Sequence, residues 1–113
     1  MKEMKPQYVY KATVTKIVDG DTVDLLVDCG FNIIRKERIR FYGVDAWETR
    51  GVEREDGLKA KKFVEEKIPV GSEVVVRTGK ERGKFGRYLG EIYVDDKSLN
   101  EMLLEEGHAE VYK

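Results

Sequence analysis

The chain has 113 residues, of which 41% are hydrophobic and 38% are charged, and its formal net charge is −1. This length suits one domain with its own core over residues 1–113, and the even mixture of acidic and basic residues excludes a disordered polyelectrolyte. A net charge so near zero gives no overall positive field, so a nucleic acid could be held only by a local basic patch.

The first part of the chain is expected to form a meander of three strands. Residues 8–18 are rich in β-branched and aromatic side chains, residues 22–28 alternate between apolar and polar, and residues 33–44 make a long third strand. Turn signals separate these strands at residues 19–21 and 29–32. Three consecutive strands with short turns therefore pair in sequence order.

The rest of the chain alternates helices and strands. Residues 58–68 have apolar side chains at helical spacing and end at a proline, residues 73–77 and 88–94 read as strands, and Ser98 with Glu101 forms a capping box for a last helix. Three strands, a helix, two strands and a helix give a mainly β (α+β) fold. This is the element order of the five-stranded Greek-key OB-fold barrel with two helices. A small open α+β sheet is the alternative.

Two acidic segments are predicted to meet at one edge of this sheet. In an antiparallel hairpin the numbers of paired residues add to a constant, and a turn centred between residues 31 and 33 places Asp21 opposite positions 41 to 45. Asp21 and Asp45 should therefore lie close together, with Asp19 and Glu48 nearby. The spacing also raises an objection, because an odd separation puts Arg40 and Asp45 on opposite faces of a regular strand. We expect a bulge or bend at Gly43.

The clustered carboxylates point to a cation. Like charges at close range repel, and a fold keeps them together only if a positive charge lies between them or one of them is protonated. Oxygen donors without cysteine or histidine select a hard metal ion, calcium first and magnesium or manganese second. Two carboxylates are too few for a closed site, so a carbonyl and water would complete it and leave room for a substrate oxygen.

Basic side chains near these acids fit a phosphate. Arg40 precedes Asp45, and the segment "KFGR" supplies Lys84 and Arg87. Arginine forks match phosphate oxygens, and together with a metal they would offset the charge of a pentacoordinate transition state. Glu48 is then free to take a proton from attacking water.

Simpler interpretations stay open for each of these residues. Arg40 could pair with Asp45 or Asp21 only to hold the hairpin, and Glu48 could be an ordinary solvated acid. Trp47 favours packing over stacking on a base.

The segments "VDGDTV", "RIRFYGVDAWET", "KFGR" and "LNEMLLEEGHAEV" together resemble the staphylococcal (micrococcal) nuclease family, in the same order and spacing and over nearly the whole chain. The resemblance implies a calcium-dependent phosphodiesterase on an OB-fold that cuts DNA and RNA at the P–O5′ bond and leaves 3′-phosphate ends. It also implies roles for individual residues: Asp21 and Asp45 as calcium carboxylates, the Ala46 carbonyl as a further ligand, Glu48 as general base, Arg40 and Arg87 as phosphate ligands, and Lys84 and Phe85 as contacts to a terminal phosphate.

The chain departs from the family at two positions within these segments. Trp47 stands where the family usually has proline, and Phe85 replaces a tyrosine of the best-known member. Loss of chemistry would leave an OB-fold module that binds nucleic acid or protein, which is the alternative function. The nuclease interpretation is favoured, because the chain has all five side chains that the chemistry needs: Asp21, Asp45, Glu48, Arg40 and Arg87.

The remaining features concern partners and location. The expected substrate is single-stranded DNA or RNA, and the expected oligomeric state is a monomer. Residues 1–12 lack the apolar run of a signal peptide, and no segment approaches the roughly 18 apolar residues that cross a bilayer. We therefore expect no membrane association, and a cytoplasmic location unless an export signal has been removed. The single cysteine, Cys29, excludes an internal disulfide.

Overall fold

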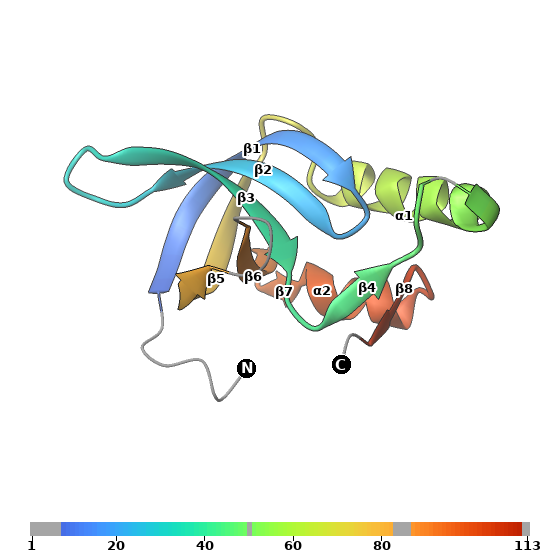
Figure 1. Cartoon of the computed structure of the whole chain (residues 1–113). Coiled ribbons are helices and arrows are strands. Elements are labelled where there is room, and N and C mark those ends of the chain that lie inside the picture. The colour runs from blue at the N-terminus through green and yellow to red at the C-terminus, as the bar shows by residue number, and fades with distance from the viewer. Residues whose placement is uncertain (1–7, 50, 83–86, 112–113) are drawn as a thin grey trace.

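The computed structural model describes residues 8–49, 51–82 and 87–111. Its elements in chain order are β1 (Tyr8–Asp19), β2 (Thr22–Asp28), β3 (Ile34–Phe41), β4 (Val44–Ala46), the 3-10 helix η1 (Gly51–Glu53), α1 (Arg54–Lys67), β5 (Glu73–Arg82), β6 (Tyr88–Val94), β7 (Lys97–Ser98), α2 (Leu99–Glu105) and β8 (Ala109–Val111) (Figure 1).

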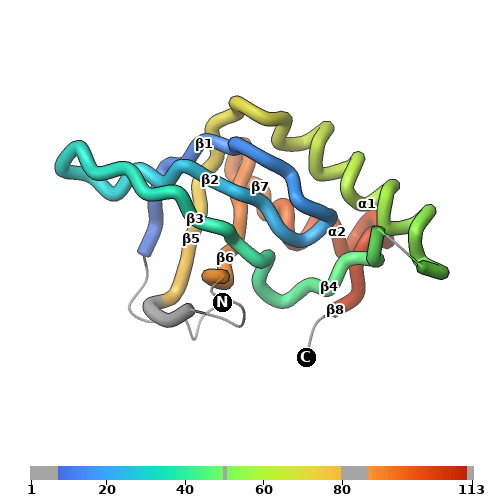
Figure 2. Tube along the Cα trace, turned by 45° about the horizontal axis from the view of Figure 1, so that its top comes forward, coloured from blue at the N-terminus to red at the C-terminus, as the bar shows by residue number. Residues whose placement is uncertain are grey.

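Five of the strands close into a barrel. The order β3-β2-β1-β5-β6 is antiparallel throughout, and a short parallel pairing of β3 with β6, from Ile39↔Tyr88 to Phe41↔Gly90, joins the two ends. The predicted five-stranded OB-fold barrel with two helices is confirmed, and the open sheet is excluded by this pairing. The tube in Figure 2 shows α1 and α2 lying beside the barrel.

The β1 strand is long enough to serve both halves of the barrel. Its first half pairs with β5 and its second half pairs with β2, and the register shifts twice along the second half, between Val14 and Lys16 and between Ile17 and Asp19. Such irregularities increase the local bend of a strand. The bend carries the end of β1, and with it the Asp19–Asp21 turn, toward α1.

The core lies inside the barrel and beneath α1. The alternating residues of β2 that were predicted to share one face, Val23, Leu25 and Val27, are all buried. On α1 the expected apolar positions Ala60 and Val64 are fully buried. Burial of these side chains fixes α1 against the barrel, because apolar area removed from water stabilises the fold by roughly 25 cal/mol per Å2.

Three predicted boundaries are corrected by the structure. The third strand does not run to residue 44 but ends at Phe41, and a separate short strand, β4, follows the turn. The first helix begins at Arg54 rather than at 58, since Glu55 and Asp56 suit its first turn. The fourth predicted strand extends beyond residue 77, because β5 pairs with β6 as far as Arg82↔Tyr88.

The β4 and β8 strands form a second, two-stranded sheet that the sequence did not predict. Val44, Asp45 and Ala46 pair with Val111, Glu110 and Ala109. This pairing holds the segment after Gly43 in an extended conformation, and so fixes the direction in which Asp45 leaves the barrel. In the part of the chain that the structure describes, neither helix has the length and apolar character needed to cross a membrane.

Candidate active site

The turn between β1 and β2 presents Asp21 to the start of β4. Asp21 is buried, its Oδ2 accepts a hydrogen bond from the Ala46 amide at 3.0 Å, and its Oδ1 accepts one from the Thr22 hydroxyl at 3.0 Å. Its main chain is fixed as well, because its amide donates to Asp19 Oδ1 at 3.1 Å and its carbonyl accepts from the Phe41 amide at 2.7 Å. The carboxylate therefore has one defined position.

Arg40 lies between two carboxylates that are far apart in sequence. Thr22 pairs with Arg40 across the β2–β3 hairpin, so Asp21 comes opposite the end of β3, as predicted. One guanidinium nitrogen of Arg40 lies 3.5 Å from Asp21 Oδ2, and the other lies 3.3 Å from Asp45 Oδ1. The expected meeting of Asp21 and Asp45 is therefore confirmed.

Gly43 is the point at which the chain bends, as the spacing predicted. Its φ is +77°, a left-handed conformation that glycine adopts without steric cost. Arg40 also helps to hold this bend, because its Nη1 donates to the carbonyls of Phe41 at 3.1 Å and Val44 at 2.6 Å. The guanidinium is largely buried and well fixed, so its structural and phosphate-binding interpretations are compatible.

The predicted residues line one cavity of about 250 Å3. Its walls are Asp19, Asp21, Arg40, Asp45, Ala46, Trp47, Glu48, Thr49 and Arg87. Six of the eight predicted site residues are among them. The other two, Lys84 and Phe85, lie outside the described residues.

The main chain at Glu48 packs against α1 at Gly57, a residue that the sequence analysis did not identify. A Cβ added to Gly57 would lie 1.8 Å from the Glu48 carbonyl oxygen, so only glycine lets the two backbones approach so closely. The Glu48 amide also donates to Glu53 Oε1 at 3.0 Å. The signal that could have identified this contact is a glycine inside a predicted helical segment.

A second close approach holds the acidic turn. A Cβ on Gly20 would lie 2.9 Å from Ala60 Cβ and 3.0 Å from Ala46 Cβ. The glycine between Asp19 and Asp21 therefore does more than permit a turn. It lets the turn pack between α1 and β4.

Trp47 is held by hydrogen bonds to the C-terminal part of the chain. Its indole nitrogen donates to the Gly107 carbonyl at 2.9 Å, and its amide donates to the His108 carbonyl at 3.4 Å. The His108 ring in turn packs on Phe63 of α1, with ring centroids 4.7 Å apart. These bonds fix the indole, and its half-buried ring also lines the cavity.

The electrostatics at Asp21 favour a cation. Burial, and after it the neighbouring Asp19 carboxyl, raise the pKa of Asp21 to about 6 against the opposing effects of Arg40 and the Ala46 amide. The Arg40 charge thus does not fully compensate the buried carboxylate. An added positive charge in the cavity would do so.

The donor set fits a hard metal ion with an open coordination sphere. The side chains that face one another at Asp21 and Asp45 offer only oxygen, which suits calcium or magnesium. Within residues 8–49, 51–82 and 87–111, no three acidic, histidine or cysteine side chains form a metal-holding group. A bound ion would therefore need main-chain carbonyl and water ligands in addition to the two carboxylates.

Comparison with known proteins adds an independent finding. The sequence profile of the family described as "Staphylococcal nuclease homologue" matches residues 38–113. The chain is 33% identical over 103 residues to "Endonuclease YncB" of Bacillus subtilis (strain 168), which covers 88% of this chain and 46% of that protein. It is 34% identical over 103 residues to "SPbeta prophage-derived endonuclease YokF" of the same organism, which covers 88% of this chain and 33% of that protein. The chain thus spans less than half the length of these two relatives.

Proposed function

The chain belongs to the staphylococcal nuclease family, and from this premise we propose that it is a calcium-dependent phosphodiesterase that hydrolyses single-stranded DNA or RNA. One observation carries the proposal: a single cavity gathers the carboxylates of Asp21 and Asp45, the guanidinium groups of Arg40 and Arg87, and the carboxylate of Glu48. Both relatives are named as endonucleases, which supports the same reaction class.

Arg40 and Arg87 are the proposed ligands of the scissile phosphate. Both line the cavity, and they approach it from different strands, at the end of β3 and just before β6. Two planar guanidinium groups can donate to the non-bridging oxygens and stabilise the negative charge that grows during attack. When a phosphate binds, the guanidinium nitrogen of Arg40 that donates to Asp45 would donate to a phosphate oxygen instead.

Asp21, Asp45 and the main-chain carbonyl of Ala46 are the proposed ligands of a divalent cation, calcium first and magnesium or manganese second. When bound, such an ion supplies Lewis-acid polarisation of the phosphodiester. Asp21 contributes the fixed, buried carboxylate, whereas the side chain of Asp45 is 57% exposed and can adjust to the ion. Lys84 and Phe85 are proposed to contact a terminal phosphate.

Glu48 is the proposed general base. It takes a proton from water as the water oxygen attacks phosphorus, the P–O5′ bond breaks, and the leaving O5′ takes a proton from solvent. The product strand keeps a 3′-phosphate. The main-chain contacts of Glu48 with Glu53 and Gly57 fix the backbone from which its side chain extends. This reduces the entropy that is lost when the carboxylate is oriented toward water.

The test is cleavage of labelled single-stranded DNA and RNA by the purified chain, with calcium and with a chelator. We expect cleavage that requires calcium, that falls by at least a hundredfold in Glu48→Gln and Arg40→Ala, and that leaves 3′-phosphate ends. Circular dichroism of each variant checks the fold. No calcium-stimulated cleavage by the folded wild-type chain would reject the enzyme and leave a binding module. A sedimentation profile tests the expected monomer.

A further inference from the structure

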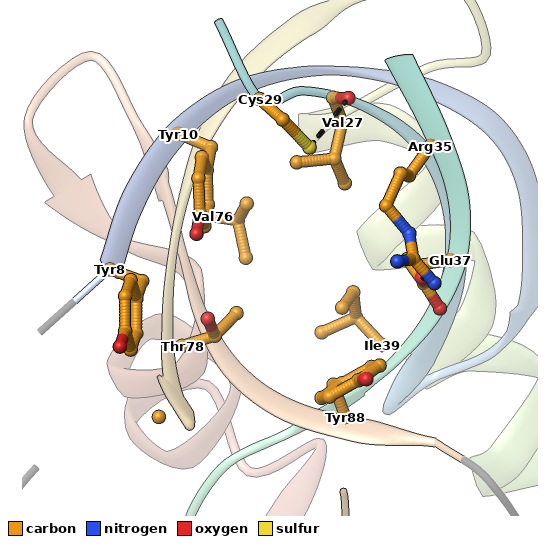
Figure 3. A pocket seen from close by; sticks show the side chains of 11 residues that line it. Tyr8, Tyr10, Val27, Cys29, Arg35, Glu37, Ile39, Val76, Thr78 and Tyr88 are labelled. Carbon is orange, nitrogen blue, oxygen red and sulfur yellow. Dashed lines mark hydrogen bonds and ion pairs between the residues drawn. The ribbon is translucent and has the colours of Figure 1, made fainter. Parts of the chain in front are cut away.

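A second cavity opens at the other end of the barrel. Among the residues that the structure describes, β3 pairs with β6 only from Ile39 to Phe41, and the cavity lies beside the first half of β3. The cavity measures about 250 Å3, and Figure 3 shows the side chains of β1, β2, β3, β5 and β6 arranged around an open centre.

The walls of this cavity combine flat aromatic rings with apolar and polar groups. The Tyr8 and Tyr10 rings are parallel within 3°, with centroids 6.5 Å apart, and Tyr88 lies across the opening from them (Figure 3). Ile39 and Val76 form apolar surface between the rings. This composition suits a planar, partly apolar ligand, because aromatic side chains stack on flat rings.

Polar groups line the same cavity. The Arg35 guanidinium pairs with the Glu37 carboxylate at 2.7 Å, and the side chain of Thr78 lines the space from β5. These groups include both hydrogen-bond donors and acceptors, as the edge of a nucleobase requires. The Arg35 charge is compensated by Glu37, so the cavity is better matched to a base than to a phosphate.

The cavity adjoins the candidate active site along two strands. Arg40 lines the active-site cavity and its neighbour Ile39 lines the barrel-end cavity, and the same relation holds for Arg87 and Tyr88. Successive side chains of a strand point to opposite faces, so only one strand pair separates the two cavities. A nucleotide close to the scissile phosphate could therefore reach the second cavity.

We propose that this barrel-end cavity is a base-binding subsite, in which a nucleobase of the single-stranded substrate stacks on the tyrosine rings and presents its edge to Arg35, Glu37 and Thr78. The inference rests on the proposed function, because it takes the polynucleotide bound at Arg40 and Arg87 as the source of the base. Its volume falls just below the roughly 300–1,000 Å3 of sites for drug-sized ligands, which fits one ring system.

Binding is measured in a Glu48→Gln background, so that the oligonucleotide stays intact. Fluorescence anisotropy with a labelled six-nucleotide single strand is expected to show about tenfold weaker binding for Tyr10→Ala, and near wild-type binding for Tyr10→Phe, which keeps the stacking face. Thr78→Trp, which fills the cavity instead of opening it, should weaken binding to a similar degree. Tyr42→Ala is the matched control, because Tyr42 is exposed and lines neither cavity.

Photo-crosslinking tests the contact directly. Oligonucleotides with a single 5-iodouracil are irradiated with the Glu48→Gln chain, and adducts at Tyr8, Tyr10 or Tyr88 from one position of the strand support the subsite. Adducts only at other residues, or unchanged binding in both Tyr10→Ala and Thr78→Trp, would overturn it. Equal affinity for a mononucleotide would also overturn it, since a site for free nucleotide would not need the polymer.

The two proposals fail in distinguishable ways. If the wild-type chain cleaves DNA and Tyr10→Ala leaves KM unchanged, the subsite is rejected and the nuclease stands. If no cleavage occurs but the tyrosine adducts form, the enzyme is rejected and the barrel-end cavity stands as a base-binding site. For an active nuclease with this subsite, Tyr10→Ala should raise KM about tenfold and leave kcat within twofold.

Discussion

Asp21 lowers the stability of the folded chain at neutral pH, because its carboxylate is buried beside Asp19 and only partly compensated by Arg40. An unfolded aspartate titrates near 3.8, whereas the pKa of Asp21 in the folded chain is about 6. Between these values the folded state binds the proton more tightly. The contribution of Asp21 to stability therefore falls as the pH rises through this window.

Asp21→Asn is expected to raise the free energy of unfolding at pH 7 in the presence of a chelator by on the order of 2 kcal/mol. Below about pH 3 the difference should vanish, because the wild-type side chain is then protonated in both the folded and the unfolded chain. Urea unfolding at both pH values measures the effect, and Asp96→Asn at an exposed turn is the control. A destabilised variant at pH 7 would contradict the argument. The same variant should lose cleavage activity.

Gly57 is expected to be essential for the position of Glu48. In Gly57→Ala the new Cβ would overlap the Glu48 carbonyl, so either the loop or α1 must move. We expect a loss of about 1–3 kcal/mol in unfolding free energy and a fall of about a hundredfold in kcat. Urea unfolding and single-turnover cleavage measure the two effects. Lys59→Ala, on the exposed face of α1, should change neither, and a fully active Gly57→Ala would disprove the positioning role.

Helix α2 is tied to the barrel by one buried side chain. Asn100 accepts a hydrogen bond from the Ile92 amide at 3.1 Å and donates to the carbonyls of Tyr42 at 2.8 Å and Gly90 at 3.2 Å. It thus joins α2 to β6 and to the bend that precedes β4. The position of Asp45 depends on this link, because the bend determines where β4 begins.

Asn100→Ala should lower the free energy of unfolding by on the order of 3 kcal/mol, because it leaves buried main-chain groups without partners. Asp45 should lose its fixed approach to the cavity, so cleavage should fall even at temperatures where the variant stays folded. Thermal unfolding followed by circular dichroism gives the stability, and Glu105→Ala on the exposed side of α2 serves as the comparison. A stability loss below 1 kcal/mol would show that water replaces the amide.

Local patterns predicted most of the barrel but not the elements that depend on distant contacts. The alternation of Val23, Leu25 and Val27 corresponds to one buried face of β2. The N-cap role of Ser98 is confirmed by the bond that its hydroxyl accepts from the Glu101 amide at 3.2 Å. In contrast, β4 and β8 are three residues each and become strands only by pairing with one another. Strands this short carry too little periodicity to be predicted from sequence.

The candidate site divides in the same way. The turn centre near residue 32 was enough to bring Asp21 to the end of β3, because hairpin register is a local property. The contacts of Glu48 with Glu53 and Gly57 could not be predicted, since they depend on how a loop packs on the helix that follows it. The sequence therefore predicted where the acidic residues lie, but not the contacts that hold them in place.

At the scale of the whole molecule, two different cavities lie next to the same pair of strands, β3 and β6. Arg40 at the end of β3 and Arg87 just before β6 line the charged cavity, whereas their neighbours Ile39 and Tyr88 line the tyrosine-lined cavity. In the two proposals, phosphate recognition and base recognition are thus separated by a single layer of backbone. Such a division lets charged groups and aromatic groups bind different parts of one nucleotide chain without competing for the same space.

The net charge of the chain predicts how its binding depends on salt. With a formal charge of −1 the protein has no general attraction for a polyanion, so binding should involve only the few cations at the active site. If Arg40, Arg87 and Lys84 neutralise about three phosphate charges, the logarithm of the binding constant for single-stranded DNA should fall with the logarithm of salt concentration at a slope of about −2.

Anisotropy titrations of the Glu48→Gln chain over a series of potassium chloride concentrations measure this slope. Arg87→Ala should make it shallower by about 0.7, whereas Lys62→Ala, at an exposed position of α1, should leave it unchanged. Tyr10→Ala should weaken binding by the same factor at every salt concentration, because stacking releases no counterions. A wild-type slope steeper than about −4 would mean that many further cations contact the strand, and that binding is not confined to the two cavities.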